Sequence, residues 1–139
     1  MSTTLPATVR TVSQLDHARL SGLLRRQPAT APSAHAVHDV IDNADLVAPQ
    51  EIEPDVVTMQ SVVVLADADS GQRRELALCY PDEANATAGR LSVLSPVGAS
   101  LLGLKVGDTA RWTLPDGTQG AARIVEVLFQ PEASGDFLA

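Results

Sequence analysis

The pattern of apolar residues changes at Pro49, and this change constrains the fold more than any other feature of the sequence. Before Pro49, apolar residues recur every three or four positions, as they do along one side of a helix. After it, apolar and polar residues alternate, β-branched residues are frequent, and turn dipeptides interrupt the chain. We therefore predict an α+β protein with an N-terminal helical region at 1–49 and a sheet domain at 50–139.

Two short helices are predicted before this boundary. Ser13 and Asp16 fit a capping box, in which Ser13 caps the first helix and Asp16 reaches back to the chain that enters it. This helix runs to about Arg26, and a second apolar stripe begins at Ser33 or Ala34. The two helices, within 11–47, then form a short antiparallel hairpin. Its tip is predicted at Gln27, Pro28, Ala29 and Thr30.

After the boundary we predict an antiparallel β-sheet with one short helix. Ser95 is placed to cap that helix, and Pro96 suits its first position because proline lacks the N–H that a helix start leaves unpaired. The helix ends near Gly103. The predicted strands cover residues 56–59, 62–65, 72–80, 90–94, 109–114 and 118–130.

The charge balance disfavours direct binding to nucleic acid. The 139 residues include 10 Lys and Arg against 17 Asp and Glu, a net charge of -7. Residues 1–49 carry four basic and four acidic residues, so the excess of acid lies in the second part. Nucleic-acid affinity depends on cations that release counterions from phosphates, and this chain is short of them. We expect no direct nucleic-acid partner.

One cysteine and a polar N-terminus suggest the compartment. Cys79 cannot close a disulfide within the chain, and we expect it to be a buried, inert thiol. Met1–Ser13 lacks the apolar stretch of a secretory signal, and the longest apolar run is Val62–Ala66. We expect a soluble cytoplasmic protein without a membrane partner.

Motifs for chemistry are weak, which favours a binding protein over an enzyme. Gly98–Lys105 resembles a phosphate-binding loop, but Leu104 is an extra residue before the lysine and Val106 replaces the required hydroxyl. His35 and His38 could join Asp39 and Asp42 in a metal site; we favour exposed His35–Asp39 and His38–Asp42 pairs instead. The histidines all lie in the helical region, away from any predicted nucleophile. We expect no catalytic residue, metal or cofactor.

Several segments of the chain resemble one protein family. They are Pro54–Ser61, Tyr80–Glu83, Gly89–Gly98, Leu101–Leu104 and Gln130–Phe137. They resemble the regulators of nucleoside diphosphate kinase, which are related to the Gre transcript-elongation factors. The resemblance implies an N-terminal coiled-coil finger followed by an FKBP-like domain.

The resemblance also implies a partner and a surface for it. The partner it implies is bacterial RNA polymerase, approached at the rim of its secondary channel. Apart from the resemblance, we expect the chain to act as a monomer. In Gre factors a loop with a Ser-Pro pair contacts the rim, which points to Ser95 and Pro96 and, next to them, Val97 and Gly98. The acidic residue that commonly precedes this pair in Gre factors is replaced by Leu94.

The fingertip decides which activity the resemblance implies. Gre factors place acidic residues there to help hold a metal ion in the polymerase, but residues 27–33 contain no Asp or Glu. We therefore expect a non-enzymatic regulator that competes with Gre factors without stimulating transcript cleavage. The alternatives are an FKBP-like prolyl isomerase or chaperone, which the few aromatic residues disfavour, and a Gre-like cleavage factor.

Overall fold

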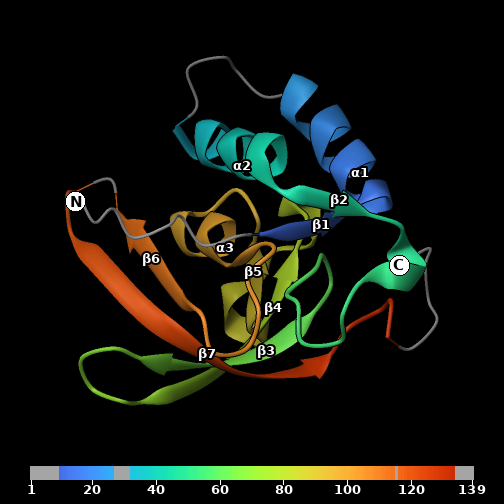
Figure 1. Cartoon of the computed structure of the whole chain (residues 1–139). Coiled ribbons are helices and arrows are strands. Elements are labelled where there is room, and N and C mark those ends of the chain that lie inside the picture. The colour runs from blue at the N-terminus through green and yellow to red at the C-terminus, as the bar shows by residue number, and fades with distance from the viewer. Residues whose placement is uncertain (1–9, 27–31, 115, 134–139) are drawn as a thin grey trace, which may run out of the picture.

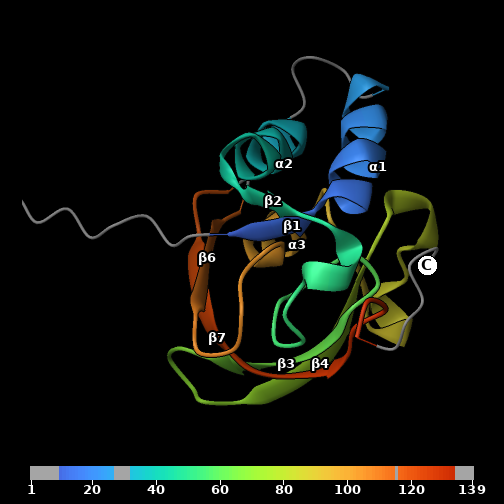
Figure 2. The same cartoon turned by 45° about the vertical axis from the view of Figure 1, so that its right-hand side comes forward.

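A curled five-stranded sheet forms the base of the structure, a computed structural model that describes residues 10–26, 32–114 and 116–133. Helices α1 and α2 lie together on the far side of α3 from this sheet (Figures 1 and 2). The helices are α1 (Gln14–Arg25), α2 (Pro32–Asn43) and α3 (Pro96–Leu101), with 3₁₀ turns at Pro49–Glu51, Pro81–Glu83 and Ala86–Ala88. The strands are β1 (Thr11–Ser13), β2 (Asp45–Val47), β3 (Val62–Asp67), β4 (Arg73–Cys79), β5 (Arg90–Ser92), β6 (Thr109–Thr113) and β7 (Gln119–Phe129).

The sheet is mixed, whereas an antiparallel sheet was predicted. Its strand order is β5-β4-β3-β7-β6, and β3, β4, β6 and β7 pair antiparallel. The short strand β5 pairs parallel with β4, because residues 80–89 carry the chain back along the sheet before β5 begins. A separate pair of strands, β1 and β2, is also parallel.

Residues 56–59 were predicted as a strand, and this was wrong. Val56 makes only an isolated bridge to Lys105, and the segment continues as irregular chain. Its apolar residues are nevertheless buried, because the segment runs through the interior and bonds to the loop after α3. The Val57 N–H donates to the Leu104 carbonyl (2.7 Å), and the Gly103 N–H donates to the Val57 carbonyl (2.9 Å). The β-branched residues of 56–59 therefore indicated a buried segment and not a strand.

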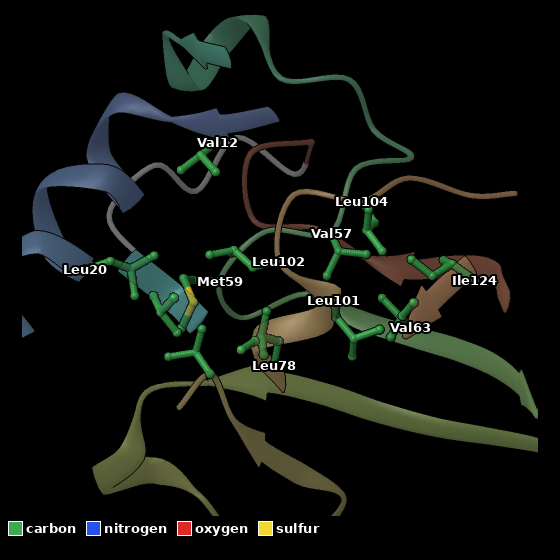
Figure 3. Close-up of a cluster of buried hydrophobic side chains, with 14 of the residues drawn as sticks. Val12, Leu20, Val57, Met59, Val63, Leu78, Leu101, Leu102, Leu104 and Ile124 are labelled. Atoms are coloured by element: carbon green, nitrogen blue, oxygen red, sulfur yellow. The ribbon is translucent and has the colours of Figure 1, made fainter. Parts of the chain in front are cut away.

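One hydrophobic cluster joins the helices to the sheet. Leu20 of α1 and Val37 of α2 are fully buried in the same cluster as Val63 of β3 and Leu101 of α3. Figure 3 shows part of this cluster, with Met59 of the irregular segment among its members. Burying such side chains is worth about 1.5–3 kcal/mol each, so α1 and α2 are held by the same interior as the sheet.

Strand β7 lies between β3 and β6, as its doubly apolar end predicted. Its register against β3 shifts twice, between Val62 and Val63 and between Val64 and Leu65. Such bulges turn side chains away from the regular alternation. Leu128 and Phe129 at the end of β7 are consequently 46% and 44% exposed.

Candidate partner-binding site

The turn at Ser95 has the capped geometry that the sequence predicted. Ser95 has extended backbone, and its Oγ accepts from the Gly98 N–H (3.0 Å) while its hydroxyl donates to the Ser92 carbonyl (2.7 Å). The Ser95 N–H donates to the same carbonyl (3.0 Å). Pro96 occupies the first helical position. These bonds fix the turn rigidly at the end of β5, with Pro96 leading into α3.

Gly98 has a structural role in this turn. The residue is buried, and a Cβ built on it would overlap the carbonyl group of Ser92, lying only 2.8 Å from its carbon. Only glycine allows the helix to approach β5 this closely. Of the four residues predicted to bind a partner, Ser95, Pro96 and Val97 are half-buried, and Gly98 offers no side chain to the surface.

Pro96 lines a groove of about 1070 Å³ between helices and sheet. Val40 of α2 and Trp112 of β6 are among its apolar walls, and Arg10 and Arg111 are its basic residues. Arg10 is fixed in place, because its Nη1 donates to the carbonyls of Ala99 (3.4 Å), Ser100 (3.1 Å) and Leu102 (2.9 Å). Burial lowers the pKa of this guanidinium, and the Asp108 carboxylate opposes the shift.

Asp16 was predicted to close a capping box, but its carboxylate instead faces the interior. Ser13 does cap α1, since its Oγ accepts from the Asp16 N–H (3.0 Å). The Asp16 carboxylate, however, accepts from the Met59 N–H (3.2 Å). The residue is only 3% exposed. Nothing in the capping pattern indicated that this side chain ties α1 to the irregular segment 56–61.

Burial gives Asp16 an unusual pKa. The pKa of Asp16 is raised to about 7, mainly by loss of hydration; the Met59 N–H lowers it, the Glu132 carboxylate raises it, and Arg19 lowers it. Glu132 is held close by Thr58, whose hydroxyl donates to its Oε1 (2.7 Å). The charge of the Asp16 carboxylate therefore changes near neutral pH.

A second hollow lies where α1 meets the turn after β4. It has a volume of about 610 Å³, and its walls include Arg19 of α1 and Tyr80. Desolvation raises the pKa of the Tyr80 phenol to about 12, with a contribution from the Asp16 carboxylate. The segment Tyr80–Glu83, one of those that carry the family resemblance, forms the other wall. Its acid Glu83 accepts from Gln60 (2.6 Å), so the acidic wall of the hollow is held by a hydrogen bond to the segment after Met59.

The other predicted chemical groups are structural or exposed. Cys79 is buried, as predicted, and burial raises the pKa of its thiol. The His38–Asp42 pair is confirmed, with Nδ1 and Oδ2 2.8 Å apart at the surface, while the side chain of His35 lies outside the described part. Within the described ranges, no three His, Cys, Asp or Glu side chains gather as metal ligands. No helix in those ranges is long and apolar enough to cross a bilayer.

The predicted fingertip residues Gln27, Pro28, Ala29 and Thr30 lie outside the described residues. Helix α1 ends at Arg25, with Arg26 as its cap, and α2 begins at Pro32. Arg25 and Arg26 are exposed, so the described chain next to the tip is basic. The described acids of the two helices, Asp16, Asp39 and Asp42, lie nearer to the other end.

Comparisons with known proteins extend these observations. Residues 48–129 match the family "Transcription elongation factor, GreA/GreB, C-term". The chain is 42% identical over 129 residues to the "Regulator of nucleoside diphosphate kinase" of Escherichia coli K12, covering 91% of this chain and 94% of that protein. It is 31% identical over 121 residues to "Transcription elongation factor GreA" of Rhodospirillum rubrum, covering 82% and 77%.

The fold is also found among solved structures. The structure of a "Prokaryotic transcription elongation factor GreA/GreB" from Nitrosomonas europaea matches with a TM-score of 0.72 and 36% identity, covering 87% of this chain and 98% of that one. The sequence matches and the structural match therefore point to the same group of proteins. This protein belongs to the regulators of nucleoside diphosphate kinase, a family that shares the C-terminal domain of the GreA/GreB elongation factors.

Proposed function

We propose that this protein regulates transcription by binding RNA polymerase at the rim of the secondary channel, where it excludes Gre-type factors without stimulating transcript cleavage. The supporting observation is the similarity to both a regulator and elongation factors across a region that includes the Ser95 turn. That turn is rigid and places Pro96 at the wall of the large groove. A preformed turn binds without losing conformational entropy, which suits a docking surface.

The lack of acid at the tip supports binding without cleavage. Residues 27–33 contain no Asp or Glu, and Arg25 and Arg26 add positive charge beside them. Holding a catalytic metal requires carboxylates within bonding distance. Helix α1, with its 12 residues, is also short, at about 18 Å for 1.5 Å per residue.

Two finer descriptions belong to the same proposal. We assign residues 1–49 to a short coiled-coil hairpin and residues 50–139 to an FKBP-like domain that carries the docking turn. The excess of acid in residues 50–139 suits a basic surface on the partner, because complementary charge speeds association and fixes orientation. The protein would act as a cytoplasmic monomer and not as an enzyme.

A binding measurement with purified core polymerase tests the surface. We expect Pro96→Asp to weaken binding at least tenfold, since it places a charge at the centre of the docking turn. Aspartate is favourable in the first turn of a helix, so the fold should survive, which a thermal unfolding curve would verify.

The matched control is Thr87→Asp, which adds the same charge at an exposed position in another turn. We expect this variant to bind as the unaltered protein does. If Pro96→Asp binds equally well, Pro96 is not in the interface; if the unaltered protein does not bind polymerase, the proposed function is wrong.

A further inference from the structure

The two edges of the main sheet differ in how their backbone groups are used. At the β5 edge, Arg90 exchanges hydrogen bonds with Asn85: each N–H donates to the other's carbonyl, at 2.9 and 3.0 Å. The Ser92 carbonyl accepts from the Ser95 N–H and hydroxyl. This edge is therefore covered by the protein's own chain. The opposite edge is β6, which among the strands of the described residues pairs only with β7.

The register of β6 shows which groups face outward. The Leu114 N–H donates to Thr118 (2.8 Å), and the Ile124 N–H donates to Asp108 (2.9 Å). Because bonded and non-bonded positions alternate along an antiparallel pair, the even-numbered residues of β6 bond to β7. The N–H and C=O groups of Thr109, Arg111 and Thr113 then point away from the sheet. In the described part of the chain none of these three residues has a backbone hydrogen bond beyond the sheet.

The groove of about 1070 Å³ lies beside this open edge. Figure 1 shows β6 at the end of the sheet, with α3 next to it and α2 beyond. Trp112 lies over Gly120 of the paired strand, where any Cβ would overlap its indole ring. The groove has apolar walls formed by Trp112, Val40 and Pro96. If another strand paired with β6, every second side chain of that strand would face these walls.

The groove is basic in an acidic protein. Arg10 and Arg111 line it, against one acid, Asp69, whereas the whole chain carries a net charge of -7. Arg111 is exposed, and among the described residues no carboxylate pairs with it. On an added strand the position opposite Arg111 would favour a carboxylate, since opposite charges across a strand pair are stabilising.

We propose that the free edge of β6 binds an extended segment of a partner protein as an additional strand, in which apolar residues alternate with acidic ones. The outward N–H and C=O groups of β6 supply the main-chain hydrogen bonds, and the groove takes the apolar side chains. Arg111 selects the acidic residues. A second copy of this chain fits less well, because an antiparallel pair centred on Arg111 would place two cations opposite each other.

The test uses the full chain and a synthetic peptide, acetyl-Thr-Val-Glu-Val-Glu-Val-Thr-amide, and needs no polymerase, so its outcome is separate from that of the proposed function. Trp112 is the sole tryptophan, so its fluorescence reports the groove. We expect saturable binding, with amide shifts in NMR spectra at Thr109, Arg111 and Thr113. A peptide with Lys in place of Glu should bind at least tenfold more weakly.

Thr113→Pro removes one outward N–H. It breaks no hydrogen bond to β7, because the N–H of Thr113 points away from that strand, and proline is tolerated on the free side of an edge strand. We expect it to weaken binding at least tenfold, while Thr113→Ala, which keeps the N–H, binds normally. Arg111→Glu should reverse the preference, so that the Lys peptide binds better than the Glu peptide. Absence of saturable binding, or a preference that Arg111→Glu leaves unchanged, would overturn the proposal, as would concentration-dependent self-association through β6.

Discussion

Burial of the Asp16 carboxylate makes the stability of the protein depend on pH. Its pKa is about 7 in the folded protein, against 3.8 for an ordinary aspartate. Between these two values the folded chain holds a proton that the unfolded chain has lost, so the free energy of unfolding falls as the pH rises from about 4 to about 7. At about 1.4 kcal/mol per pKa unit the loss amounts to a few kcal/mol.

Asp16→Asn should remove this dependence. The amide oxygen can still accept from the Met59 N–H, and no charge has to be buried. We expect the variant to be about 1–3 kcal/mol more stable than the unaltered protein at pH 8 and similar to it at pH 4.5, measured by urea unfolding. Asp39→Asn, at an exposed position of α2, is the control and should keep the original pH dependence. An equal loss of stability above pH 5 in Asp16→Asn would contradict this assignment.

Two glycines in helices should respond in opposite directions to the same change. Gly98→Ala places a methyl group on the Ser92 carbonyl, which should lower the free energy of unfolding by about 2–4 kcal/mol. Gly22 in α1 has open space around it. Gly22→Ala should therefore raise the free energy of unfolding by about 0.5–1 kcal/mol through helix propensity. Chemical denaturation of both variants checks the prediction, and a Gly98→Ala protein of normal stability would refute the close approach.

At the scale of elements, Arg10 links the β1 strand to the end of α3. Its side chain satisfies carbonyls of Ala99, Ser100 and Leu102 that the short helix leaves unpaired. We expect Arg10→Ala to lower the free energy of unfolding by about 1.5–3 kcal/mol, the usual range for hydrogen bonds from a charged group. Arg73→Ala, at an exposed position of β4, should change it by less than about 0.5 kcal/mol. Similar small effects in both variants would mean that Arg10 does not stabilise the helix end.

Elements with local signals were predictable, and those that depend on distant contacts were not. Ser13 and Ser95 cap their helices because capping is decided within three residues of the chain. The segment 56–59 was misassigned because its hydrogen bonds go to the loop at Gly103 and Leu104, which no local pattern reveals. The parallel pairing of β5 likewise depends on how residues 80–89 return along the sheet.

The same distinction holds for the two proposed binding surfaces. The Ser95 turn could be found from its cap and from the family resemblance. The open edge of β6 could not, because which strand ends a sheet depends on the order of all five strands. The burial of Asp16 was missed because its hydrogen-bond partner, Met59, is 43 residues away in sequence.

At the scale of the whole molecule, the helices and the sheet share one interior. Leu20 of α1 and Val37 of α2 are buried in the same hydrophobic cluster as residues of the sheet and of α3. The two helices are therefore anchored to the rest of the protein by this cluster. Under the proposed function, helices held in this way would enter the secondary channel while the Ser95 turn binds its rim. Their basic, carboxylate-free end would give them no means of supporting cleavage there.

Stalled elongation complexes of RNA polymerase provide the decisive test of binding without cleavage, with RNA length as the readout. We expect that the protein alone leaves the transcript intact, and that increasing amounts of it suppress the shortening caused by a Gre factor. Pro96→Asp should suppress this shortening at least tenfold less effectively. Transcripts that shorten when this protein is added by itself, or Gre-dependent cleavage that persists at saturating amounts of it, would show that the protein does not act by blocking Gre factors.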